Sequence, residues 1–172
     1  MVWRISDPEI GVQPIATTST VQNHGIGKIV NAKDPTYGHG EFIYLLGVAN
    51  TLAGLVVVYD AVTGKTGLGS TSGVVDGGGP VAVAMSANVA AQWGWYQIGG
   101  NAVVLKTATK LDPATPTVKV YLSATAGRVM PTSVAGRQVI GARFSTLATV
   151  TTTTSTCIVT LNRPSQKTGT LV

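Results

Sequence analysis

The residues that could bind a metal lie in the first quarter of the chain. They are His24, Asp34, His39 and Glu41. Imidazole and carboxylate groups are common zinc ligands, but ligation requires them to converge on one point. Glycines flank His39 on both sides and leave the local geometry loose. The segment therefore favours a polar turn, and we expect no metal site.

Arrangements typical of covalent or acid–base catalysis are missing from the sequence. No serine lies in the Gly-x-Ser-x-Gly pattern of a nucleophile elbow. A Ser-His-Asp triad would have to use one of two histidines, both in an irregular N-terminal region. Asp60, Asp76 and Asp112 occur at turns or strand ends, where aspartate is ordinary. We expect no catalytic residues and no enzymatic activity.

Two glycine-rich segments resemble nucleotide-binding loops but lack their defining partners. Gly64-Lys65-Thr66 ends like a phosphate-binding loop, but Tyr59 stands where that loop needs glycine, and no helix follows. Residues 67–73 resemble a dinucleotide fingerprint displaced by one position, without an acidic partner in a βαβ unit. Both segments favour loops, so we expect no cofactor.

Two tryptophans form the most distinctive aromatic pair. On a strand, Trp93 and Trp95 point to one face and Tyr96 to the other. Such a pair could stack on a sugar or a base. Because aromatic residues make up only 6% of the chain, a core or subunit interface is the favoured interpretation.

Cysteine and charge exclude several further classes of protein. The single cysteine, Cys157, forms no intramolecular disulfide and lies in an apolar run, which favours a buried thiol. Twelve Lys and Arg against seven Asp and Glu give a net charge of +5, but the basic residues are scattered along the chain. This dispersion argues against direct nucleic-acid binding and favours attraction to an acidic partner surface.

The elements that would position these residues are short strands at roughly ten-residue spacing. The expected strands cover residues 41–49, 53–61, 65–68, 81–85, 93–98, 102–107, 118–122, 137–144 and 156–161, and a turn at 126–128 leads into Val129-Met130. A tight hairpin is expected at Gly99-Gly100 or Gly100-Asn101. This spacing predicts an all-β fold, a single β-barrel or a jelly-roll-like sandwich.

The uncharged stretch from Phe42 to Tyr59 is close to the minimum length of a membrane-spanning helix. Asn50 and Thr51 at its centre, and β-branched residues after them, favour two strands instead. We expect no membrane partner. The N-terminal residues also lack the apolar region of a signal peptide, so no leader is expected.

Residues 1–40 differ from the rest of the chain because their apolar residues are isolated. We interpret them as an extended N-terminal arm preceding a β-barrel or sandwich domain at 41–172. The arm would lie on a partner or on its own barrel, with Trp3, Ile5 and Ile10 as buried anchors. On this interpretation, deleting residues 1–35 leaves a folded barrel that no longer binds its partner.

Three segments carry a resemblance to a known family. They are Trp93–Val104, Lys119–Val129 and Val139–Arg143, an aromatic strand and its return, a Val-Tyr-Leu hairpin and an Ile-Gly-Ala strand. Their style and order resemble head decoration (cement) proteins of tailed bacteriophages, over roughly residues 80–145.

The resemblance implies a structural virion protein on the outside of a capsid, made in the host cytoplasm. Its implied partners are the major capsid protein and further copies of itself, as a dimer or trimer. Trp3, Ile5, Ile10, Trp93 and Trp95 are the expected partner-binding residues. The alternative is a glycan- or receptor-binding module of a phage tail, with Trp93 and Trp95 on the glycan.

Composition agrees with an assembly component. Charged residues are 11% of the 172 residues, against about 25% in ordinary soluble domains. Hydrophobic residues reach 44%, and with so low a net charge they exclude a disordered chain. Once the membrane is excluded, the low charge favours a Thr-, Gly- and Val-rich β surface that is covered in an assembly.

Overall fold

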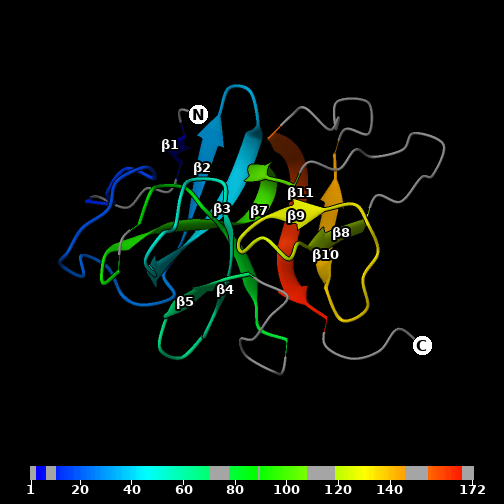
Figure 1. The fold of residues 1–172 in the computed structure, drawn as a ribbon. Coiled ribbons are helices and arrows are strands. Elements are labelled where there is room, and N and C mark those ends of the chain that lie inside the picture. The colour runs from blue at the N-terminus through cyan, green and yellow to red at the C-terminus, as the bar shows by residue number, and fades with distance from the viewer. Residues whose placement is uncertain are drawn as a thin grey trace.

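The computed structural model describes residues 3–6, 11–69, 78–88, 90–107, 119–145 and 155–167. These residues form the predicted all-β fold, with eleven strands in one large antiparallel sheet and no helix (Figure 1). The strands are β1 (Arg4–Ile5), β2 (Ile29–Asp34), β3 (Gly38–Leu46), β4 (Val56–Tyr59), β5 (Thr66–Leu68), β6 (Val81–Ala84), β7 (Trp93–Leu105), β8 (Lys119–Leu122), β9 (Val129–Met130), β10 (Gln138–Phe144) and β11 (Thr156–Gln166).

The sheet runs in the order β1-β2-β3-β7-β11-β10-β8-β9 and curls back on itself. A parallel bridge between Lys106 and Val129 returns β9 to the end of β7. The Thr107 amide donates to the Val129 carbonyl at 3.0 Å beside this bridge. β7, β11, β10, β8 and β9 therefore surround a barrel-like interior, against which β4 and β6 pack.

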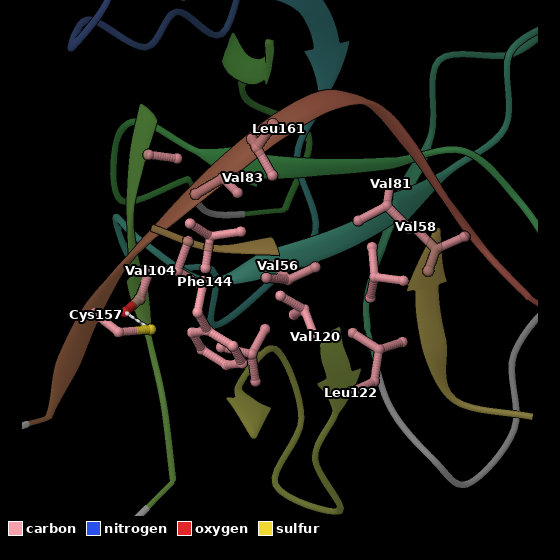
Figure 2. Packing of buried hydrophobic residues seen from close by; sticks show 14 residues of the cluster. Val56, Val58, Val81, Val83, Val104, Val120, Leu122, Phe144, Cys157 and Leu161 are labelled. Carbon is pink, nitrogen blue, oxygen red and sulfur yellow. Dashed lines mark hydrogen bonds between the residues drawn. The ribbon is translucent and has the colours of Figure 1, made fainter. Parts of the chain in front are cut away.

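Branched apolar side chains fill that interior (Figure 2). The alternation of buried positions along β11 and β10 directs one face of each strand inward, as a period of two requires. The buried cluster is Val56, Val58, Val81, Val83, Ala102, Val104, Val120, Leu122, Val129, Val139, Phe144, Cys157, Val159 and Leu161. A remaining cavity of about 10 Å³ is lined by apolar residues, so the interior has no room for a ligand larger than a water molecule.

The predicted hairpin at Gly99–Gly100 is wrong, because β7 continues through it for thirteen residues. The register with β3 shifts between Glu41 and Phe42, which marks a bulge rather than a reversal. Gly100 has a φ of 83°, and a Cβ at this position would collide with the His39 carbonyl. The buried Gln97 amide donates to the Gly99 carbonyl at 2.9 Å and the Asn101 carbonyl at 3.1 Å, which holds the bulge.

Two other segments refine the predicted elements. The uncharged stretch at 42–59 is divided between β3 and β4, as expected. Among the described residues, no helix is long and apolar enough to span a membrane. β11 extends to Gln166, five residues beyond the predicted end, because its last part pairs with the start of β10.

Strand pairing crosses the predicted arm boundary at residue 40. β2 pairs with β3 along its whole length, and β1 pairs with β2 through Arg4–Lys33 and Ile5–Ala32. Val30 and Ala32 are fully buried beneath residues 11–28. Deletion of residues 1–35 would remove these two strands and the cover of an aromatic core, so from the structure we expect it to disrupt the fold rather than to leave a folded barrel.

Candidate partner-binding surface

The predicted anchor residues lie against the molecule's own sheet. Trp3, Ile5 and Trp93 are half-buried and pack on the cluster that contains Trp95, which is 0% exposed. Ile10 lies outside the described residues. The cluster occupies one face of β2, β3 and β7, and it brings Trp3, Ile5 and Trp93 into contact with their own chain.

Ring contacts fix the geometry of this aromatic cluster. The Tyr44 ring lies 5.0 Å from Trp95 and stacks on Trp93 at 5.8 Å between centroids. Trp3 meets Phe42 edge-on at 4.9 Å. Because Trp95 has no exposed surface, the two tryptophans do not form an open platform on which a sugar could stack.

Hydrogen bonds hold residues 11–28 over the cluster. The Trp95 indole N–H donates to the Gln13 carbonyl at 3.1 Å, and the Gln13 amide donates to His24 Nε2 at 3.4 Å. The Asn23 amide donates to the Tyr44 hydroxyl at 3.3 Å. Burial raises the pKa of Tyr44, and the Asn23 bond partly offsets this effect. His24 is used in packing beside Tyr44 and Trp95.

The acidic residues of the suspected metal cluster have other roles. Asp34 Oδ1 accepts the amides of Thr36 at 2.8 Å and Tyr37 at 3.1 Å, which closes the turn between β2 and β3. Glu41 binds Arg163. Within the part of the chain that the structure describes, no group of three potential ligands could hold a metal ion.

Cys157 is buried, and its thiol donates to the Val104 carbonyl at 3.7 Å (Figure 2). Burial raises the pKa of this thiol to about 12, although nearby Lys106 opposes the shift. A thiol is nucleophilic only as the thiolate. Cys157 is therefore a core side chain.

The lysine of the Gly64-Lys65-Thr66 motif lies at the hairpin between β4 and β5. Asp60 Oδ1 accepts the amides of Val62 at 2.7 Å and Thr63 at 2.9 Å in this turn. These two hydrogen bonds, to Thr63 and to Val62, are the main reason that the pKa of Asp60 is lowered. The motif is thus an Asp-stabilised turn.

A polar groove of about 460 Å³ crosses the sheet where β3, β7 and β11 meet. Gly99 and Gly100 form its floor, and Asn31 and His39 lie at one side. At the other side, Arg163 Nε donates to Glu41 Oε2 at 3.1 Å. This hydrogen bond and the carboxylate charge raise the pKa of Arg163.

A second hollow, of about 410 Å³, adjoins the groove and shares Asn162 with it. It is lined by residues of β10 and β11, including Arg143 and Thr160. Arg163, within β11, has a φ of 41°, in the left-handed region that favours glycine. This backbone turn accompanies the register shift between β10 and β11.

Basic residues that are far apart in sequence are brought together by strand register. Arg4 lies opposite Lys33, and Lys33 lies opposite His39. On the barrel side, Arg143 lies opposite Lys119. We call these five exposed residues the basic row. Sequence reasoning missed the row because each member lies on a different strand, and only the register aligns them.

Exposed apolar side chains occur beyond the basic row. Ile26 lies against Gly64 in the β4–β5 turn, close to Val62, which is 87% exposed. The large apolar residues with most exposure are Val21, Ile26, Ile29, Leu52, Val62 and Ile140. The surface thus offers both apolar and basic contact areas.

Comparisons of the chain with protein families, with curated proteins and with solved structures found no match.

Proposed function

We propose that this protein is a structural virion component that binds the outside of a bacteriophage capsid and stabilises contacts between major capsid subunits. It would act as a homo-oligomer, without a cofactor, a membrane or direct nucleic-acid contact. On this proposal it works through its surface rather than through a reaction.

The observation that carries the proposal is a filled barrel combined with a surface poor in charge. The cavity inside the barrel is about 10 Å³, which leaves no ligand chamber. Charged residues are only 11% of the chain, and Ile26 and Val62 are exposed. Apolar and uncharged surface of this kind favours burial in an assembly over a free monomer.

The segments that resemble decoration proteins have a defined place in this fold. Trp93–Val104 lies in β7, Lys119–Val129 spans β8 and the turn into β9, and Val139–Arg143 lies in β10. All are strands that surround the barrel interior. The resemblance therefore concerns the strands that build the barrel. It supports the proposal because these strands form the type of β domain that the resemblance implies.

A head-stability assay tests the proposal. Expanded, DNA-filled heads that lack decoration are heated with and without the purified protein. We expect the protein to raise the temperature at which heads release DNA, with an effect that saturates. Unchanged release at saturating protein contradicts a stabilising role.

A further inference from the structure

From the strand register we infer that the basic row is a docking surface for an acidic protein, through carboxylates on the partner. The inference deepens the proposed function and rests on it for the identity of the partner, because it names the face that would meet the capsid shell. It also assigns a role to basic residues that the sequence shows only as scattered.

Register places the basic row on one face of the sheet. Residues directly opposite each other in antiparallel strands point to the same face, about 5 Å apart. Arg4, Lys33 and His39 are aligned in this way across β1, β2 and β3, and all three are exposed. The neighbouring positions Ile5 and Ala32 point to the opposite face, into the aromatic cluster.

The second half of the row continues on the outside of the barrel. Asn101 of β7 lies opposite Thr160 of β11, and Thr160 lies opposite Arg143 of β10, which faces Lys119 of β8. Asn101 Nδ2 also donates to the Tyr37 carbonyl at 3.4 Å, at the turn between β2 and β3. This contact joins the two halves beside the polar groove.

Acidic residues do little to neutralise this face. The described residues include three acids, namely Asp34, Glu41 and Asp60. Asp34 is buried in its turn, and Asp60 lies at the β4–β5 hairpin. Glu41 lies two residues from His39 on β3 and is paired with Arg163. Among the described residues, no acid therefore pairs with Arg4, Lys33, Lys119 or Arg143.

The chemistry of the row favours a protein over a nucleic acid. Proteins that bind single strands add several aromatic side chains on which bases stack, whereas His39 is the single aromatic ring of the row and the row contains no Phe, Tyr or Trp. The groove beside the row includes Asn162, whose amide can donate to and accept from a protein surface.

The test compares two variants of the full chain that lose the same charge. Lys33→Gln with Lys119→Gln changes the basic row, and Lys65→Gln with Lys167→Gln changes lysines outside it. Binding to undecorated heads is measured over a salt series from about 50 to 300 mM. Poly-L-glutamate and duplex DNA serve as separate probes, and thermal unfolding checks that both variants are folded.

We expect the row variant to bind heads about tenfold more weakly at low salt, with a shallower salt dependence. The control variant should stay within about twofold of the unmodified protein. Equal affinity and salt dependence of the two variants on heads would overturn the inference while leaving capsid binding intact.

The soluble probes separate this inference from the proposed function. If the unmodified protein binds no heads, the proposed function fails, and poly-L-glutamate decides the inference alone. If poly-L-glutamate binds the unmodified protein and the control variant but not the row variant, the basic row is supported as the docking surface. If poly-L-glutamate binds none of the three proteins, or binds all three equally, the inference is overturned. Tighter, row-dependent binding of duplex DNA also overturns it in favour of a nucleic-acid partner.

Discussion

Single residues decide how the longest strand changes direction. Gly99-Gly100 and Gly100-Asn101 suit a two-residue hairpin, but the same dipeptides also suit a bulge. The difference comes from residues distant in sequence: β3 pairs with β7 on both sides of the bulge, and β11 pairs with Gly99 and Gly100. Local sequence therefore located an irregular backbone at this point but could not determine its type.

Replacing Gly100 tests this account of the bulge. Gly100→Ala should destabilise the protein by about 3 kcal/mol or more, because the residue has a positive φ and its Cβ would collide with the His39 carbonyl. Gly25→Ala is the matched control, since nothing lies within 4 Å of its Cβ position. Urea denaturation measures both, and equal stability of the two variants would contradict the bulge geometry.

Because of Cys157, we expect the folded protein to lose stability at alkaline pH. Its thiol has a pKa of about 12 in the folded protein, against 9.0 for an ordinary thiol. Because the folded pKa is the higher one, the stabilisation is complete below pH 9 and is lost as the pH rises toward 12. Over that range, ionisation of the thiol should lower the free energy of unfolding by about 1.4 kcal/mol per pH unit.

The buried phenols act in the same direction as the thiol. Burial raises the pKa of Tyr44 and of Tyr96, so their contribution is also lost at high pH. Urea denaturation between pH 7 and 11 measures the combined slope, and Cys157→Val should make it shallower. A slope that this substitution leaves unchanged would show that the thiol ionises as freely in the folded protein as in the unfolded chain.

At the scale of elements, period-two patterns predicted the strands well. Residues 81–85 and 118–122 alternate or carry β-branched runs, and they form β6 and β8. β2 was missed because Ile29–Asp34 contains two charged or amide side chains that face solvent and one that closes a turn. The buried residues of β2 are Val30 and Ala32. They can be recognised as core residues only when it is known that residues 11–28 cover them.

Truncation distinguishes an external arm from an integral part of the fold. Deletion of residues 1–35 removes β1 and β2 and uncovers Phe42, Tyr44 and Trp95, which are all 0% exposed. Exposure of these side chains should cost about 1.5–3 kcal/mol each. The truncated chain should bind a hydrophobic dye and lose cooperative thermal unfolding. An unchanged unfolding temperature would restore the interpretation of the segment as a dispensable arm.

The basic row also belongs to the scale of elements. Arg4, Lys33 and Lys119 are separated by long stretches of sequence, and no local pattern relates them. Strand order and register place the first two opposite each other and the third on the same side of the sheet. Candidate surface residues of this kind can be predicted only after the pairing of the strands.

At the scale of the whole molecule, the low charge has a specific structural setting. The barrel interior is filled, the aromatic cluster is covered by residues 11–28, and the exposed apolar residues include Val21, Leu52 and Val62. A surface with so little charge favours association over a free monomer.

We expect this surface to promote self-association. We expect a dimer or trimer in solution, with a mass that is two or three times the 17.6 kDa of the chain. Sedimentation equilibrium over a wide concentration range measures it. A monomer at all concentrations, in a protein that unfolds cooperatively, would contradict the expected homo-oligomer.

Quantitative co-sedimentation with capsids tests the central claim most directly. The purified protein is titrated against expanded, undecorated heads, and the bound amount is measured per major capsid subunit, with a β-protein of similar size and charge as control. We expect saturable binding that reaches a fixed ratio set by the symmetry of the shell. Binding that does not saturate, or that equals the control, would contradict a capsid decoration protein.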